Sequence, residues 1–293
     1  MHIMYDMDSF FNVLFGVSKP LCVCVYDNIF TKKGYGKRMI RFLIPAYNEE
    51  KNLRVLLKRI DTLMKEDYLD YHVLIIDDGS RDNTLGLIEE YRSEIPVRVV
   101  SHPANYGVDE AFRTGFREIL KECEPRDIVI TMEADNTSDI HIMEKMIAKI
   151  GSGDDLVLAS CYAKGGGVEG TTRFRLFLSA CANGLLKTFF PIKGVNTYSS
   201  FYRAYRSETL KKAFQLYGDH FIEEKGFVCM VERLIKFHRM NLRISEVPMV
   251  LKGQLRDGQS KMKIFPTILG YCDVIRRNFL RRNWTPRSKN GPK

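Results

Sequence analysis

The chain has 293 residues, of which 45% are hydrophobic and 28% are charged, proportions that are ordinary for a globular enzyme of one large or two small domains. The formal net charge is +9, but residues 276–293 hold seven basic and no acidic residues, so the remainder is close to neutral. This distribution excludes a basic surface for nucleic acid over the whole body and indicates a local contact with an anionic partner. The seven cysteines are scattered without a pair of CxxC motifs, which argues against a zinc site and favours reduced thiols in a cytosolic protein.

Residues 1–38 precede the first regular pattern and form a predicted N-terminal extension. The most apolar part, residues 10–26, is broken by Asn12, Lys19 and Pro20 and falls short of the ~20 residues of a membrane span. It also lacks a basic start and a small-residue cleavage site, so it is not expected to be a signal peptide. We expect it to pack on the following domain or to order a surface for a partner.

Between residues 39 and 159, short apolar runs alternate with segments whose apolar residues recur at helical spacing. The predicted strands are 39–44, 73–76, 97–100, 128–132 and 156–159, and the predicted helices are 49–64, a segment from 80 or 82 to 91, 108–123 and 139–150. This alternation with short connections predicts an α/β fold, a mostly parallel sheet with helices on both faces.

Polar clusters follow these strands at their carboxyl ends, where ligands bind in such sheets. They are Tyr47-Asn48-Glu49, Asp77-Asp78, Asn105-Tyr106-Gly107 and Glu133-Ala134-Asp135. The last is the most informative, because a strand that ends in two carboxylates can hold Mg²⁺ or Mn²⁺ against a diphosphate. The simpler alternative is a solvated strand end.

The second half of the chain is less regular. Its predicted elements are a mobile Gly-rich loop at 163–172, helices at 174–190 and 226–240, strands at 201–206 and 242–250, and a polar loop at 255–261. Residues 263–282 predict an amphipathic helix, which has apolar residues along one face at Phe265, Leu269, Cys272, Ile275 and Phe279.

Four of these segments together resemble the family 2 glycosyltransferases with the GT-A fold, and within them the dolichol-phosphate mannose synthases and bacterial polyprenyl-phosphate relatives. The segments read FLIPAYNEE at 42–50, IIDDGSRDNT at 75–84, NYG at 105–107 and EAD at 133–135. Residues 163–170, 201–206, 246–248 and 258–261 extend the resemblance, which covers about residues 39–262. It implies a GT-A nucleotide-binding domain at 39–262, followed by the amphipathic helix and basic tail at 263–293.

The resemblance also implies an activity and its partners. The chain would transfer a sugar, with inversion, from GDP-mannose or a UDP-sugar to a polyprenyl phosphate, using Mg²⁺ or Mn²⁺. It would work at the cytoplasmic face of a membrane, bound peripherally, and a membrane-protein subunit is a candidate partner. No nucleic acid is expected as a partner.

On the donor side, the resemblance assigns the nucleotide pocket to Pro45, Tyr47, Glu49, Ile76 and Asp78. Tyr47 would lie beside the base, and Asp78 is also, from its chemistry alone, an acceptor for base N–H groups. Simpler roles remain open here, because Pro45 can end a strand and Asp77 can cap the following helix.

At the diphosphate, the resemblance places Glu133, Ala134 and Asp135, with the two carboxylates as metal ligands. It assigns catalytic roles to Asp135, to Arg175 at the acceptor phosphate, and to Lys261, which would neutralise phosphate from the C-terminal loop. The simpler role for Lys261 or Arg175 is a solvated surface cation.

Several positions depart from the family pattern, mostly on the acceptor side. Glu133 stands where the family's acidic motif begins with Asp, and Cys161 stands where an acceptor-phosphate Arg is usual, so Lys164 or Arg173 would have to compensate. An Asp expected near Thr197 is missing, and the Arg expected three residues before Gly258 is replaced by Leu255, with Arg256 one residue late. The acceptor is therefore less well specified than the donor.

Two alternatives follow from this. A family 2 enzyme with a hydroxyl acceptor would need a carboxylate base, for which Glu223, Glu224 and Glu232 are the candidates, the first two being expected to face solvent. The chain could also be a catalytically weak, sugar-nucleotide-binding partner subunit. The basic tail, in which Phe279 and Trp284 are interleaved, is expected to hold the protein on an anionic membrane without spanning it.

Overall fold

The computed structural model of the chain describes residues 38–66, 69–258 and 264–280, and the side chains of 266–278 in the last range. Lys261, the basic tail beyond residue 280 and almost all of the predicted N-terminal extension lie outside the described residues.

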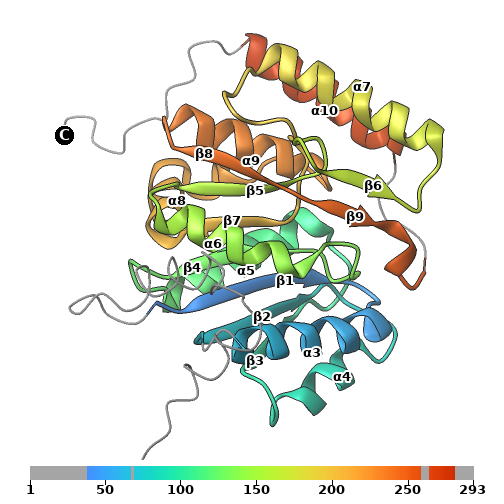
Figure 1. Ribbon diagram of the computed structural model, residues 1–293, viewed down its shortest axis with the longest axis vertical. Coiled ribbons are helices and arrows are strands. Elements are labelled where there is room, and N and C mark those ends of the chain that lie inside the picture. Colours follow the sequence, from blue (N-terminus) through green and yellow to red (C-terminus); the bar gives the residue numbers. More distant parts are fainter. Residues whose placement is uncertain (1–37, 67–68, 259–263, 281–293) are drawn as a thin grey trace, which may run out of the picture. The chain divides into compact units, whose positions relative to one another are not determined.

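The described part is organised around a seven-stranded sheet with the strand order β3-β2-β1-β4-β7-β5-β8 (Figure 1). The strands are β1 (Ile40–Ala46), β2 (Tyr71–Asp77), β3 (Val97–Ser101), β4 (Ile128–Thr131), β5 (Leu156–Ser160), β7 (Arg203–Arg206) and β8 (Ile244–Pro248). β7 runs antiparallel to both of its neighbours, β4 and β5, and the other pairings are parallel. The predicted, mostly parallel sheet is therefore confirmed.

The helices are α3 (Glu50–Glu66), α4 (Thr84–Tyr91), α5 (Val108–Glu122), α6 (Met143–Gly151), α7 (Arg173–Phe189), α8 (Ser207–Tyr217), α9 (Val228–Arg239) and α10 (Ile264–Leu280). Short 3₁₀ turns occupy Ile140–Ile142, Gly218–Phe221 and Gly253–Leu255. α8 is not among the predicted elements, although its residues Leu210, Ala213 and Tyr217 are buried at helical spacing.

Helices cover both faces of the sheet, as burial along β1 illustrates. Leu43 belongs to a buried cluster with Phe112 and Phe116 of α5. Its chain neighbours Phe42 and Ile44 are equally buried but do not belong to that cluster. Since successive side chains of a strand point to opposite faces, both faces of the sheet are packed.

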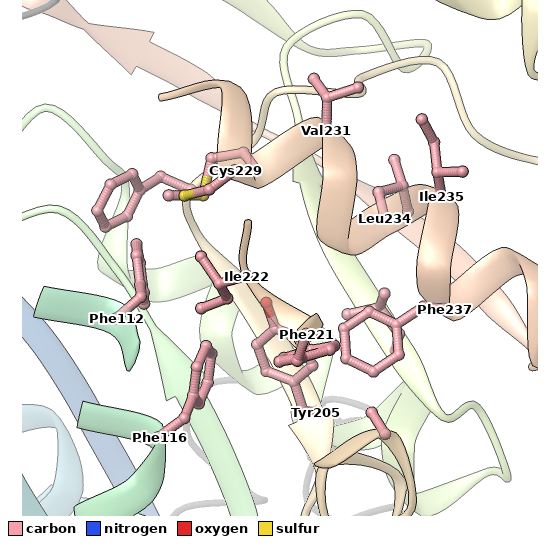
Figure 2. Close-up of a cluster of buried hydrophobic side chains, with 14 of the residues drawn as sticks. Phe112, Phe116, Tyr205, Phe221, Ile222, Cys229, Val231, Leu234, Ile235 and Phe237 are labelled. Atoms are coloured by element: carbon pink, nitrogen blue, oxygen red, sulfur yellow. The ribbon is translucent and has the colours of Figure 1, made fainter. Parts of the chain in front are cut away.

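The cluster on the α5 face is rich in aromatic rings (Figure 2). The Phe116 ring lies 6.0 Å from that of Tyr205 on β7, and the Phe221 ring lies 5.4 Å from that of Phe237 on α9. The Arg233 guanidinium is fully buried in this layer, 4.0 Å from the centre of the Phe112 ring, a cation–π contact. This packing fixes α5, β7 and α9 to one another on the α5 face of the sheet.

The Gly-rich segment contains a short strand, so its interpretation as a mobile loop is wrong for residues 167–169. Strand β6 (Gly167–Glu169) pairs in parallel with β9 (Val250–Lys252) in a separate two-stranded sheet. At Gly166 a Cβ would lie 2.4 Å from the backbone oxygen of Ser160, and at Gly170, where φ is +68°, 2.6 Å from the backbone nitrogen of Gln254. Glycine is therefore required here for close approach of the backbone.

α7 and α10 lie side by side at one end of the described structure, and α10 also contacts α9 (Figure 1). Along α10 the buried side chains include Tyr271, Val274 and Ile275. Two members of the predicted apolar face, Leu269 and Cys272, point outward instead, and Leu269 is 70% exposed. None of the described helices is long and apolar enough to cross a membrane.

Candidate active site

The sheet topology brings the predicted polar clusters to one edge. β2, β1 and β4 are parallel neighbours, so the residues that follow Asp77, Ala46 and Thr131 leave the sheet on the same side. Ile76 is fully buried beneath this edge and pairs with Pro45, while Tyr47 and Glu49 are partly exposed at it. Ala134 is buried between the two carboxylates.

Asp135 is almost completely buried, and both of its oxygens have partners. Its Oδ1 accepts hydrogen bonds from the backbone N–H of Thr137 at 3.1 Å and from the Thr137 hydroxyl at 2.7 Å. Its Oδ2 accepts two from the Arg256 guanidinium, the Nε bond being 2.7 Å long. The Asp135 carboxylate is thus already paired with a cationic side chain.

Glu133, the other carboxylate of this motif, carries a perturbed pKa. The Ser138 hydroxyl donates to its Oε2 at 2.9 Å. Burial, followed by the negative charge of Asp135, raises the pKa of Glu133 to about 7, although the positive charge of Arg256 acts in the opposite direction. The two carboxylates therefore form a site that is short of positive charge.

This shift predicts a pH dependence of stability in protein free of divalent cations. Between its ordinary pKa of 4.5 and about 7, folded Glu133 keeps a proton that the unfolded chain has lost, so the free energy of unfolding falls as pH rises. Because Glu133 retains a partly exposed edge, solvent reduces the effect. Urea unfolding measures the free energy of unfolding at pH 5 and at pH 7.5. Its decline between these two pH values should be smaller in Glu133→Gln than in the parent protein, by roughly 1–3 kcal/mol. Equal declines in the two proteins would contradict the shift.

The residues present fit a divalent cation. Within the described ranges no group of three or more His, Cys, Asp or Glu side chains could hold a metal ion by itself. Mg²⁺ and Mn²⁺ often take only one or two carboxylates and complete their shell with phosphate and water. Glu133 and Asp135 supply that donor set. The Arg256 guanidinium that is paired with Asp135 shows that this position stabilises a positive charge.

Asp78 is buried at the end of β2 and organises the loop after β3. Its Oδ1 lies 2.8 Å from Nδ1 of His102 and accepts from the Tyr106 backbone N–H at 3.0 Å. Its Oδ2 accepts from the Gly107 backbone N–H at 2.8 Å, and Nε2 of His102 lies 3.0 Å from the Thr114 hydroxyl. In this structure Asp78 holds the wall of the predicted nucleotide pocket; its predicted contact with a base stays a prediction.

The loop after β1 is fixed by side chains of the next connection. The backbone N–H of Glu49 donates to the Thr84 hydroxyl at 2.9 Å, and that of Asn48, where φ is +51°, donates to the Ser80 hydroxyl at 2.8 Å. Asp77 accepts from the Ser80 N–H at 3.1 Å in the turn after β2. It does not cap the following helix, because α4 begins at Thr84 with Asn83 at its N-cap position.

One functional residue that the sequence analysis missed is Asn52 on α3. Its side-chain nitrogen donates to the Glu49 carboxylate at 2.6 Å and to the Asp257 carbonyl at 3.1 Å, and its Oδ1 accepts from the Asp257 N–H at 3.0 Å. Its carbonyl accepts from the Asn136 side chain at 2.7 Å. Asn52 thus joins the regions after β1, β4 and β9. The signal available in the sequence was its position as a polar residue next to the apolar face of a predicted helix. In the structure Asn52 is 4% exposed.

On the predicted acceptor side, Arg175 lies in the first turn of α7, where its backbone N–H donates to the capping Thr172 hydroxyl. Burial, followed by nearby Glu133, raises the pKa of Cys161 to about 11, so the thiol is neutral near pH 7 and supplies no charge. Thr197, where an Asp was expected, has its hydroxyl 2.6 Å from that of Ser160. The sequence offers no way to see this contact.

Each of the three candidate bases has a charged partner: Glu223, which faces solvent as expected, lies 3.1 Å from Nζ of Lys236. Glu232 is buried and accepts from the backbone N–H groups of Glu223 and Glu224 and from Lys236. Glu224 pairs with Arg277 of α10 at 2.8 Å and has a 13% exposed side chain, so the expectation that it faces solvent is wrong. These carboxylates join α9 to its neighbours.

Comparison with known proteins gives a consistent set of relatives. The family model described as Glycosyl transferase family 2 matches residues 42–214. A dolichol-phosphate mannosyltransferase of Pyrococcus furiosus is 30% identical over 239 residues, which are 81% of this chain and 63% of that protein. A polyprenol monophosphomannose synthase of Mycolicibacterium smegmatis is 28% identical over 222 residues, which are 75% of this chain and 79% of that protein. The chain thus matches less than two thirds of the length of the first relative.

Among solved structures, glucosyl-3-phosphoglycerate synthase of Mycobacterium tuberculosis superimposes with a TM-score of 0.56 at 18% identity, over 89% of this chain and 90% of that one. A structure of the same synthase with Mn²⁺, UDP-glucose and phosphoglyceric acid gives a TM-score of 0.54 at 19% identity, over 83% and 85%. These likenesses confirm the predicted fold class.

Proposed function

Because the chain belongs to glycosyltransferase family 2, we propose that it transfers a sugar from GDP-mannose or a UDP-sugar to a polyprenyl phosphate, with inversion and with Mg²⁺ or Mn²⁺. The observation that carries the proposal is the pair Glu133 and Asp135 after β4, at the same sheet edge as Asp78 after β2. The names of the two similar proteins, a dolichol-phosphate mannosyltransferase and a polyprenol monophosphomannose synthase, support the acceptor class.

The reaction we propose is a single displacement at the anomeric carbon. An oxygen of the acceptor phosphate forms the new bond to that carbon, while the bond to the donor diphosphate breaks from the opposite face and the nucleoside diphosphate leaves. A metal held by Glu133 and Asp135 would stabilise the negative charge that develops on the leaving diphosphate. Lys261, which lies outside the described residues, is proposed to add positive charge there.

The hydrogen bonds and ion pairs of the candidate bases favour a phosphate acceptor over a hydroxyl acceptor. A phosphate is already an anion and needs no general base, whereas a hydroxyl needs a base within hydrogen-bond reach. Glu232 is occupied by two backbone N–H groups and Lys236, and Glu224 by Arg277, which leaves them poorly suited as bases. We assign Arg175 to the acceptor phosphate, because it starts the helix that follows the Gly-rich segment and can bind phosphate bidentately.

The acceptor class is tested by offering the full chain a labelled nucleotide sugar with a polyprenyl phosphate or with the corresponding polyprenol. Label should enter the lipid only with the phosphate, and mild acid should release it, because a glycosyl phosphate bond is acid-labile. Equal transfer to the polyprenol would show a hydroxyl acceptor. Hydrolysis of the donor without transfer to either lipid would still indicate an enzyme, whereas neither hydrolysis nor transfer would favour the catalytically weak, sugar-nucleotide-binding partner subunit.

We also propose a peripheral site on the cytoplasmic face of a membrane, through α7 and α10. Phe174 and Phe177 of α7 are each 64% exposed, and Leu185 and Phe189 continue the same side of the helix. Leu269, which is exposed on the neighbouring α10, belongs to the contact that we propose. Exposed apolar side chains clustered on helices beside basic residues are typical of interfacial binding.

The double substitution Phe174→Ser with Phe177→Ser should therefore weaken vesicle binding by about 10-fold or more, because burial of two aromatic side chains is lost. Flotation with anionic vesicles at low salt is the measurement, and high salt should release the parent protein. Val55→Ser with Leu216→Ser is the matched control, since both residues are exposed and lie on α3 and α8. Flotation that is unchanged in the phenylalanine variant would place the contact elsewhere.

A further inference from the structure

Arg256 makes an ion pair across the candidate active site. Its Nε and a second guanidinium nitrogen both donate to Oδ2 of Asp135, which is 121 residues away in the chain. The Arg256 side chain is 24% exposed and that of Asp135 is 11% exposed, so solvent screens this pair less than a surface pair. A guanidinium in this arrangement is a strong partner for a carboxylate.

The segment that carries Arg256 is anchored on both sides. Before it, the Lys252 N–H donates to the Thr137 carbonyl at 2.8 Å. After it, the backbone N–H and carbonyl of Asp257 are both bound by the Asn52 side chain, at 3.0 and 3.1 Å. The contact with Asp135 is therefore built into the packing of residues 252–257 against the sheet edge.

Arg256 occupies the oxygen that a metal ion would need. Oδ1 of Asp135 already accepts two hydrogen bonds from Thr137, so Oδ2 is the oxygen left for a cation. A divalent cation on this oxygen would be repelled by a guanidinium that donates two hydrogen bonds to it, and the two would compete for the same lone pairs. One must leave when the other binds.

We infer that Arg256 and the divalent cation compete for Oδ2 of Asp135, so that Arg256 keeps metal affinity low until a nucleoside diphosphate is present. The diphosphate favours the metal-bound state in two ways: its oxygens complete the metal shell, and they offer the displaced guanidinium another anion. Metal and nucleotide then bind cooperatively, each with low affinity alone. This inference rests on the proposed metal site at Glu133 and Asp135.

The test is Mn²⁺ binding to the full chain, followed by the electron paramagnetic resonance signal of free Mn²⁺, first without nucleotide. Arg256→Ala and Arg256→Gln should each bind Mn²⁺ at least about 10-fold more tightly than the parent, since the competitor is gone. With GDP or UDP at saturating concentration, the difference should shrink to less than about 3-fold. Lys252→Ala is the matched control, because it removes the same charge from an exposed position four residues away.

The outcomes separate the inference from the function on which it rests. Equal Mn²⁺ affinity in the parent and both Arg256 variants, with binding abolished by Asp135→Asn, would overturn the competition but leave the metal site intact. A gain in Lys252→Ala as large as that in Arg256→Ala would also overturn it, in favour of a general charge effect. No Mn²⁺ binding in any protein, with or without nucleotide, would remove the metal from the proposed function and the competition with it.

Discussion

Asp135→Asn is expected to lower the rate of sugar transfer by at least about 100-fold, the usual effect of losing one preorganised electrostatic contact in an active site. The amide keeps the size of the side chain but removes its charge. It weakens the proposed metal site and, at the same time, the pair with Arg256. Initial rates with saturating donor and acceptor are the measurement.

The control for this substitution is Asp219→Asn, which makes the same chemical change at a side chain that is 86% exposed. It should transfer sugar at the rate of the parent. Wild-type turnover in Asp135→Asn would show that the charge of this carboxylate is not needed for the chemistry, and full activity of the parent in excess chelator would show that a metal is not.

Asp78→Ala is expected to weaken the binding of GDP or UDP by about 10- to 100-fold, the effect of removing a charged hydrogen-bond partner from two or more donors. The substitution leaves the N–H groups of Tyr106 and Gly107 and the ring of His102 without their acceptor. The loop that they fix forms one wall of the predicted pocket. Titration calorimetry with each nucleotide measures the change.

His102→Ala removes one of these three donors and keeps the carboxylate, so it should reduce nucleotide affinity less than Asp78→Ala does. If Asp78→Ala bound both nucleotides as tightly as the parent protein, the pocket would have to lie elsewhere. Circular dichroism of both variants separates loss of binding from loss of folding.

The parallel half of the fold could be predicted because each of its elements has a local signal. Apolar runs such as β2 and spaced apolar residues such as those of α3 alternate with short connections, and this pattern fixes the sheet type. The β6–β9 pair could not be predicted, because it joins three-residue strands more than 80 residues apart. The antiparallel insertion of β7 between β4 and β5 likewise depends on tertiary packing.

The candidate site could be predicted where it follows from strand ends and not where it follows from contacts between distant segments. Asp78, Glu133 and Asp135 each follow a buried strand, so topology alone brings them to one edge. The side chains that bind these carboxylates are distant in sequence, and no local pattern indicates them. They are Arg256 for Asp135 and His102 for Asp78. Periodicity likewise identified an apolar face on α10 but could not show that Leu269 lies outside the core.

The central claim is a metal-dependent transfer of sugar to a lipid phosphate. The most direct measurement is the amount of label that the full chain moves from GDP-mannose or UDP-glucose into the organic phase with a polyprenyl phosphate, with Mg²⁺ or with chelator. We expect labelled lipid with one of the donors in Mg²⁺ and a loss of at least about 100-fold in chelator. Label that remains in the aqueous phase with both donors, or transfer that is equally fast in chelator, would contradict it.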